Sequence, residues 1–579
     1  MFPCSGGELG SMRALPLIII VGADDLALRV CEELCATQGH EVLLLSDDDP
    51  AVAERARTAG ATFVGLPPNE YESLRAAGIL EATSIMPVSP DDRLNLQVAL
   101  KARDLNPDIR IVLRQFNRTL GRKIEQNVAN CTAVSPAAHA AASYAAAAVD
   151  PACTYAIQFP DIDGDLVGFS QRRAEDFGVV GIAASEAERR ISARIVCVNG
   201  DTAYDPLRAL AAGDRVIAFG PLPALEAAWP KARGRAESPF RWRLRFVLVG
   251  LPRSIARREP LLVRILIAGA VTFTAASLYF MWALRLSLVT ASYFVTQTMA
   301  AVGYGDITPY DRAAGWPVLL VTMAIMLAGV SISGVFIASI ASALSRAQIV
   351  ALQGLRHIHA EDHVVVCGAG NVGSSVIDLL LRMRRRVVVI EQNPSSLLIE
   401  MARDRRIELL TGDATNDETL GFCDLATARS FVAVTNSDTA NLEAVLGARV
   451  INPALSVVMR VMDRAFARSV ERNFTIAKSF STSELAVAMI AGLSRFPGTR
   501  GRVAFEGGTY DLGERPEKEI IDEAPPPAGK RIPLYVRRDG RLVPLHDFSE
   551  MKPDDRVLFI VSLSQGNLHP ESSPEAASR

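Results

Sequence analysis

The stretch Thr298-Met-Ala-Ala-Val-Gly-Tyr-Gly-Asp306 decides how the whole chain is organised. Gly303 and Gly305 alternate with larger residues, and glycine adopts left-handed backbone angles that a side chain resists. The apolar segment 288–298 just before it predicts a short helix, and apolar runs long enough to cross a bilayer flank both. An isolated Gly-Tyr-Gly-Asp usually forms only a turn. Here the flanking runs predict a re-entrant loop between two membrane spans.

The core of this stretch, Val302-Gly-Tyr-Gly-Asp306, resembles the selectivity filter of potassium channels. The filter residues that the resemblance implies are Ala301, Val302, Gly303, Tyr304, Gly305 and Asp306. Backbone carbonyls of the first four, contributed by four chains, would replace the hydration shell of the permeant K⁺. The ring of Tyr304 would pack against the pore helix, and Asp306 would brace the outer mouth. Ala300 and Ala301 stand where most family members have two threonines, so the innermost ion site keeps only carbonyls. One filter per chain implies a homotetramer.

Composition limits the class of protein. The chain has 579 residues, which suggests three or four domains at about 150 residues per domain. Its hydrophobic content of 49% is high for a wholly soluble protein, and a net charge of -3 argues against a nucleic-acid partner. The eight cysteines lack paired metal-type spacing, so we expect reduced intracellular thiols. Residues 1–13 and 565–579 are expected to be disordered tails, because they are rich in small and polar residues.

The chain before the membrane runs predicts a doubly wound α/β domain over 14–150. Apolar strands alternate with helical spacing, which is typical of βαβ units and a parallel sheet. The expected strands and helices are, in order, Leu17–Val21, 26–36, 41–45, 94–103 and 109–113. From 151 to 235, short strands such as Arg194–Val198 and 215–219, with Gly-Asp turns, predict a small α+β subdomain.

The region 240–348 predicts an all-α pore domain with two membrane-spanning helices. Six arginines between 241 and 258 precede the first apolar run, 261–283, and positive charge stays on the cytoplasmic side. We therefore expect a multi-pass protein of the cell (inner) membrane, embedded in the lipid bilayer, with both termini in the cytoplasm. The second run, 316–344, is longer than a bilayer core and should project into the cytoplasm. Gly329 and Gly334 within it stand where the inner helices of potassium channels bend, which implies a gating hinge, although glycine also serves helix packing in membranes.

After a linker at 349–362, a second Rossmann-like α/β domain is expected over 363–495, followed by a small α+β subdomain over 501–563. The run His363-Val-Val-Val-Cys-Gly-Ala-Gly-Asn-Val-Gly373 contains Gly-x-Gly-x-x-Gly, whose glycines let a phosphate approach the N–H groups of a helix. A second strand, Val387–Glu391, ends in an acid that could bind ribose hydroxyls. The segment resembles the regulator-of-potassium-conductance domain, also called RCK or KTN. The expected nucleotide-binding residues are Gly368, Gly370, Asn371, Val372, Gly373, Glu391, Asp413, Ala414, Thr435 and Arg460.

The first α/β domain repeats the second. The segments that begin at Asn95 and Asn441 are alike, and the same offset of 346 residues relates Gly22 to Gly368. The copies differ where a nucleotide would bind, because Asp24, Ala27, Leu45 and Pro67 stand opposite Gly370, Gly373, Glu391 and Asp413. An aspartate repels a pyrophosphate. We therefore expect the amino-terminal copy to be a structural partner with a degenerate site and the carboxyl-terminal copy to be the ligand sensor.

Together these patterns predict a potassium-selective channel gated by a cytosolic ligand. Eight RCK domains of a homotetramer would form a gating assembly that biases the inner pore helices. The expected small-molecule ligand is an adenine nucleotide, NAD(H) or ADP/ATP, with Ca²⁺ or another divalent cation as the alternative. His357, His359 and His363, beside two acidic residues, could bind such a cation or could simply form a polar linker.

Three other functions fit less well. An enzyme would need a substrate domain with an acid–base pair, and neither is evident, so no catalytic residue is expected. A potassium transporter regulated by similar domains carries four pore repeats in one chain, whereas this chain has one. A membrane-tethered nucleotide sensor or regulatory subunit with a weakly conducting pore stays as the alternative, supported only by Ala300 and Ala301.

Overall fold

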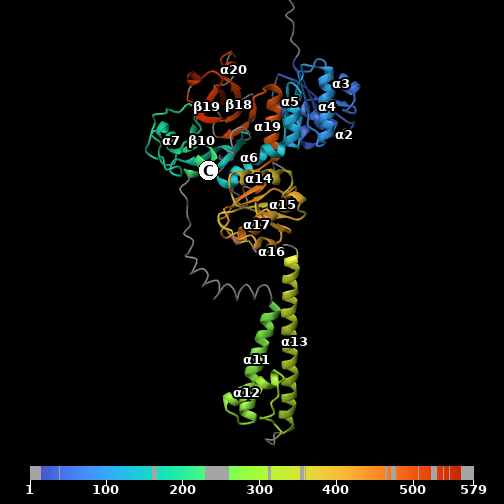
Figure 1. Cartoon of the computed structure of the whole chain (residues 1–579), viewed down its shortest axis with the longest axis vertical. Coiled ribbons are helices and arrows are strands. Elements are labelled where there is room, and N and C mark those ends of the chain that lie inside the picture. The colour runs from blue at the N-terminus through green and yellow to red at the C-terminus, as the bar shows by residue number, and fades with distance from the viewer. Residues whose placement is uncertain are drawn as a thin grey trace, which may run out of the picture. The chain divides into compact units, whose positions relative to one another are not determined.

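The computed structural model divides into two compact units, one formed by Met1–Pro230 with His357–Arg579 and the other by Lys231–Arg356 (Figure 1). The residues that it describes are 15–37, 39–159, 166–228, 260–310, 315–352, 358, 360–462, 466–467, 469–470, 472, 478–505, 508–522, 531–538, 540–546 and 548–562. The two expected tails and the six arginines before the first span lie outside these ranges.

The amino-terminal α/β domain is a six-stranded parallel sheet in the order β3-β2-β1-β4-β5-β6, as predicted. Its strands are β1 Leu17–Val21, β2 Glu41–Ser46, β3 Thr62–Gly65, β4 Ser84–Pro87, β5 Arg110–Arg114 and β6 Cys131–Val134. Its helices are α1 Asp25–Ala36, α2 Pro50–Ala59, α3 Tyr71–Ala76, α4 Asp92–Leu105, α5 Arg118–Asn127 and α6 Pro136–Val149. The central strands are buried on both faces, which is why they read as continuous apolar runs.

The carboxyl-terminal α/β domain has the same topology, in the order β13-β12-β11-β14-β15-β16. Its strands are β11 Val364–Cys367, β12 Val387–Glu391, β13 Glu408–Thr411, β14 Ser430–Ala433, β15 Ser456–Arg460 and β16 Lys478–Phe480. Its helices include α14 Asn371–Arg382, α15 Ser396–Arg403, α16 Asp417–Gly421, α17 Asp438–Ile451 and α19 Thr482–Arg495.

Hydrogen bonds confirm the internal repeat. The Asn95 amide donates to the carbonyl of Ser89 at 2.7 Å and to that of Arg114 at 3.1 Å. The Asn441 amide does the same to Thr435 at 3.3 Å and Arg460 at 3.1 Å. Both asparagines are fully buried, so each fixes two backbone carbonyls at the carboxyl end of its sheet.

The two copies exchange their last helices. Helix α6 follows the first sheet in the chain but packs on α14 and in the core of the second sheet, while α19 packs on α1 and in the core of the first (Figure 1). The Tyr144 hydroxyl on α6 donates to the carbonyl of Phe480 at 2.7 Å, and the Ser430 hydroxyl donates to that of Ala148 at 2.8 Å. Each copy therefore completes the core of the other, which joins both into one unit.

Each α/β domain continues into a small subdomain with an antiparallel sheet, as predicted. The first has β7 Cys153–Gln158, β8 Leu166–Arg173, β9 Arg194–Val198 and β10 Arg215–Pro221, with α7 Ala184–Ile191 and α8 Leu222–Ala227. The second has β17 Thr499–Phe505, β18 Gly508–Pro516, β19 Arg531–Arg538, β20 Arg541–Pro544 and β21 Arg556–Ser562, with α20 Glu517–Asp522 and a 3₁₀ turn at Phe548–Glu550. Aromatic and aliphatic side chains from both sheets form one shared core.

The membrane unit consists of α11 Pro260–Ala283, α12 Leu288–Met299 and α13 Trp316–Leu352. Among the described residues, two segments are long and apolar enough to cross a membrane, Arg264–Ala283 and Trp316–Ser339, which fits the two expected spans. Helix α12 is the expected short pore helix, and its buried Phe294 packs edge-to-face on Phe280 of α11 with ring centroids 4.9 Å apart. The run from residue 300 to 310 returns from α12 without helix or strand.

Candidate functional site

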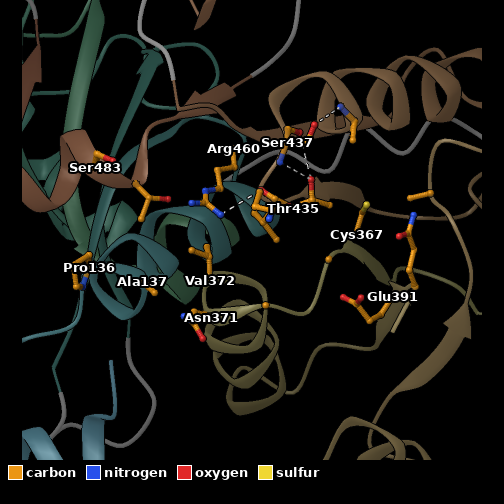
Figure 2. A pocket seen from close by; sticks show the side chains of 18 of the residues that line it. Pro136, Ala137, Cys367, Asn371, Val372, Glu391, Thr435, Ser437, Arg460 and Ser483 are labelled. Atoms are coloured by element: carbon orange, nitrogen blue, oxygen red, sulfur yellow. Dashed lines mark hydrogen bonds between the residues drawn. The ribbon is translucent and has the colours of Figure 1, made fainter. Parts of the chain in front are cut away.

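The largest concentration of predicted site residues lies in a pocket of about 880 Å³ at the carboxyl ends of β11, β12, β14 and β15 (Figure 2). Ligands of doubly wound sheets bind at this edge. The predicted residues that line it are Gly368, Gly370, Asn371, Val372, Glu391, Asp413, Ala414, Thr435 and Arg460. The remaining one, Gly373, lies behind the loop instead of on the pocket wall.

The three glycines of the loop are present for different physical reasons. Gly368 has φ +89°, a left-handed conformation that favours glycine. A side chain on Gly373 would overlap the carbonyl oxygen of Gly368, so this glycine allows the close packing of helix on loop. Gly370, the N-cap of α14, has φ -66° and open space around it. No side chain caps α14, so the N–H groups of its first turn are available to a ligand.

Acidic side chains at the pocket are held by backbone groups. Glu391 accepts hydrogen bonds from the N–H of Ala369 at 2.7 Å and from that of Asn393 at 3.1 Å. Its carboxylate thus fixes the glycine loop and keeps lone pairs that ribose hydroxyls can use. The pKa of Asp413 is lowered, first by a hydrogen bond from the N–H of Thr415, so this carboxylate is ionised at the pocket edge.

Arg460 supplies positive charge to the pocket. Its Nη1 donates to the carbonyl of Thr435 at 3.2 Å, which holds the guanidinium inside the pocket (Figure 2). Burial raises the pKa of the Cys367 thiol, which also lines the pocket, to about 12, so this thiol stays neutral.

The other wall of the pocket comes from the amino-terminal copy, through Asp24, Asp25, Leu26, Arg114 and Phe116. Sequence reasoning missed this shared wall. The repeat located the equivalent residues of the two copies, but the helix exchange that brings the copies together leaves no local signal.

The second candidate site is the filter loop. Gly303 and Gly305 have φ +58° and +78°, so the expectation that glycines supply left-handed angles is confirmed. Ala301 is also left-handed, with φ +57°, which costs about 1 kcal/mol in a residue with a side chain. Left-handed residues therefore alternate along the loop at 301, 303 and 305.

Gln297 of α12 braces this loop and was missed from sequence. Its Oε1 accepts from the N–H of Tyr304 at 3.2 Å, and its Nε2 donates to Asp306 at 3.2 Å. Its backbone carbonyl accepts from the N–H of Val302 at 3.0 Å. Gln297 is only 5% exposed, and a buried amide needs partners. No signal in the sequence singled it out, because α12 also carries several hydroxyl side chains.

The side chain of Tyr304 is 72% exposed in the single chain. The packing of its ring on a pore helix stays a prediction for the assembled channel. Within one chain, Gln297 braces the loop against the pore helix.

The proposed hinge glycines differ in their surroundings. Helix α13 is continuous from Trp316 to Leu352, through both glycines. A Cβ on Gly329 would lie 2.6 Å from backbone atoms of Met299 at the end of the pore helix, whereas nothing lies within 4 Å of one on Gly334. Gly329 is thus needed for close packing, and the hinge role of both glycines stays a prediction.

Only one of the three histidines of the possible cation site lies in the described part of the chain, so that site stays a prediction. His357 and His359 lie outside the described residues. His363 is fully buried, and its Nε2 lies 2.8 Å from the carbonyl oxygen of Cys423. Burial lowers the pKa of His363. His363 therefore lies in the core of the carboxyl-terminal domain, directly before β11.

Family models agree with this architecture. The TrkA-N domain model matches residues 18–136 and 364–480, and the Ion channel model matches residues 262–346. The chain thus carries two Rossmann-like TrkA-N domains that flank an ion-channel domain with two apolar helices.

Particular relatives are potassium channels. The chain is 29% identical over 181 residues to the voltage-gated potassium channel Kch of Escherichia coli (strain K12), covering 31% of this chain and 42% of Kch. It is 26% identical over 176 residues to potassium channel protein 1 of Methanocaldococcus jannaschii, covering 30% of this chain and 52% of that protein. The chain spans about half the length of these relatives. The solved GsuK channel shares the fold, with a TM-score of 0.50 and 13% identity over 95% of this chain and 77% of that chain.

Proposed function

We propose that the protein is the subunit of a homotetrameric potassium-selective channel gated by a cytosolic ligand. The observation that carries the proposal is the filter loop, in which left-handed residues alternate at 301, 303 and 305 between two membrane-length helices. Such alternation turns successive carbonyls toward one axis, where four chains together could replace the hydration shell of K⁺. The potassium-channel relatives support the same ion, and the protein would act in the cell membrane with both soluble ends in the cytoplasm.

The regulatory ligand in this proposal is an adenine nucleotide bound at the pocket of the carboxyl-terminal copy. The uncapped start of α14 and Arg460 suit a phosphate, and Glu391 suits a ribose. One solved structure of this fold is the GsuK channel bound to NAD. NAD(H) and ADP/ATP are therefore the first ligands to test. Binding would change the packing of the joined copies and so bias α13.

Ion flux in liposomes tests the proposal. Purified protein should pass K⁺ well and Na⁺ poorly, and the nucleotide should change the flux of wild-type protein. Gly305→Ala is the matched control, because φ +78° strains any side chain while the added methyl meets no atom within 4 Å. It should fold and not conduct. Nucleotide binding without any flux in wild-type protein would instead favour the membrane-tethered sensor.

A further inference from the structure

The glycine loop of the amino-terminal copy departs from the dinucleotide fingerprint at one position. The motif allows alanine at its last position, so Gly22-Ala-Asp-Asp-Leu-Ala27 fits except where Asp24 replaces the middle glycine. That aspartate caps α1, since its Oδ1 accepts from the N–H of Ala27 at 3.1 Å. Its Oδ2 lies 2.5 Å from Nη1 of Arg114. The amino-terminal copy therefore holds its own carboxylate between a helix start and an arginine.

The carboxyl-terminal copy has the same frame without the carboxylate. Arg460 ends β15 as Arg114 ends β5, and each donates Nη1 to a carbonyl just beyond the neighbouring strand, Thr435 at 3.2 Å and Val88 at 2.8 Å. Gly370 replaces the aspartate and leaves α14 without a side-chain cap. Within the described residues, no carboxylate pairs with Arg460, whereas Asp24 pairs with Arg114. The Nε atoms of both arginines are buried without a partner, so the carboxylate is the difference between the copies.

We infer that Asp24 is an internal anion that holds, in the amino-terminal copy, the place of a ligand phosphate in the carboxyl-terminal copy, and so closes the amino-terminal site. The inference rests on the proposed function, in which Arg460 and the start of α14 bind the phosphate, and goes beyond it by giving Asp24 a role. Charged hydrogen bonds to a phosphate are the strong ones, so the phosphate dominates recognition over the base. An unphosphorylated nucleoside should bind poorly.

The same inference gives a new reason why the amino-terminal copy would not bind a nucleotide. Asp24 and Arg114 are 26% and 11% exposed and neutralise each other. The copy is thus closed by an internal anion that is already in place, and simple repulsion of a ligand is not the cause. It stays permanently in the arrangement that the other copy reaches only with ligand.

Transplanting the internal anion tests this. A side chain fits at Gly370, because φ is -66° and a Cβ there meets no atom within 4 Å. Gly370→Asp should supply Arg460 and α14 with a carboxylate, whereas Gly370→Asn adds the same volume without charge. In full-length protein without ligand, Gly370→Asp should have the higher Tm of the two. Equal melting temperatures of Gly370→Asp and Gly370→Asn would overturn the inference. This result would not depend on whether the protein binds a nucleotide.

Calorimetry with ADP and adenosine gives the second readout. Wild-type protein should bind ADP at least about tenfold more tightly than adenosine, and Arg460→Ala should remove most of that difference. Gly370→Asp should lose ADP binding more completely than Gly370→Asn. Equal binding of ADP to the Arg460→Ala variant and wild type would overturn the assignment of the phosphate. If wild-type protein binds no nucleotide, only the proposed function is contradicted. The role of Asp24 is still decided by the Tm values of Gly370→Asp and Gly370→Asn without ligand.

Discussion

Gln297 is the side chain that ties the filter loop to the pore helix. It meets Tyr304 and Asp306 at 3.2 Å each, and it is buried. Replacing it with leucine leaves the N–H of Tyr304 unpaired, which costs about 1 to 3 kcal/mol. We expect Gln297→Leu to lower K⁺ flux and the selectivity for K⁺ over Na⁺ in liposomes. Gln297→Glu keeps an acceptor for the N–H of Tyr304 but places a second negative charge beside Asp306. If only Gln297→Leu changes flux and selectivity, this added charge is harmless. Unchanged selectivity in both variants would contradict the brace.

Glu391 makes the second prediction at the scale of single residues. A carboxylate that accepts hydrogen bonds from a ribose contributes about 1.5 to 3 kcal/mol. Glu391→Ala should therefore weaken nucleotide binding roughly tenfold to a hundredfold in calorimetry. Glu391→Gln is the matched control, because it keeps one oxygen for the N–H of Ala369 and so preserves the loop. NADP should bind worse than NAD, because the acid repels a 2′-phosphate. If Glu391→Ala binds the nucleotide with full affinity, the ribose does not bind beside Glu391.

Residues of the site were predictable where one motif demanded them. The glycine pattern located the loop and the acid at the end of β12, because both depend on local backbone geometry. The role of Gln297 was not predicted, since it depends on a loop that folds back on the helix. The ion pair of Asp24 with Arg114 joins residues that are 90 positions apart in the chain. Alignment of the two copies therefore showed that Asp24 replaces a glycine, but not that Arg114 pairs with it.

At the scale of elements, Gly329 and Gly334 of α13 form a natural pair of test sites. Gly329→Ala should push α13 off the pore helix, because the new methyl meets the backbone of Met299. We expect a lower Tm of the purified channel. Gly334→Ala should leave the Tm unchanged, because nothing within the chain lies near it. If this glycine is the hinge, the variant should open less in single-channel recordings. Normal opening of Gly334→Ala would rule the hinge out.

Helix α6 carries a pH-dependent prediction. Burial lowers the pKa of His139 from 6.5 to about 4, and its Nε2 lies 3.1 Å from the Tyr155 hydroxyl. The unfolded chain binds a proton at His139 below pH 6.5, whereas the folded chain does so only near pH 4, so stability falls as pH drops through this window. The Tm of the unit that contains α6 should therefore decline between these values. His139→Gln should flatten the decline. An unchanged slope in His139→Gln would show that other groups cause the decline.

The elements themselves followed from periodicity, but their partners did not. Strands β1, β9 and β12 have the predicted bounds, because apolar runs buried on both faces are unambiguous. Helix α6 is alanine-rich and buried almost all round, which predicts a core position without saying in which core. Its packing on α14 of the other copy depends on contacts more than 200 residues apart, such as that of Tyr144 with Phe480, 336 residues on.

At the scale of the whole molecule, one pocket bounded by both copies makes binding stoichiometry the sharpest prediction. The internal anion closes the amino-terminal site, and only the carboxyl-terminal copy offers a free helix start with Glu391. Calorimetry on the purified protein should find about one nucleotide site per chain, four in the proposed tetramer, because only one of the two copies in each chain can bind. Asp24→Asn, which weakens the pair with Arg114, should lower the Tm without ligand. Eight equivalent sites, or binding that is lost in Asp24→Asn but kept in Glu391→Ala, would show that the amino-terminal copy is the sensor.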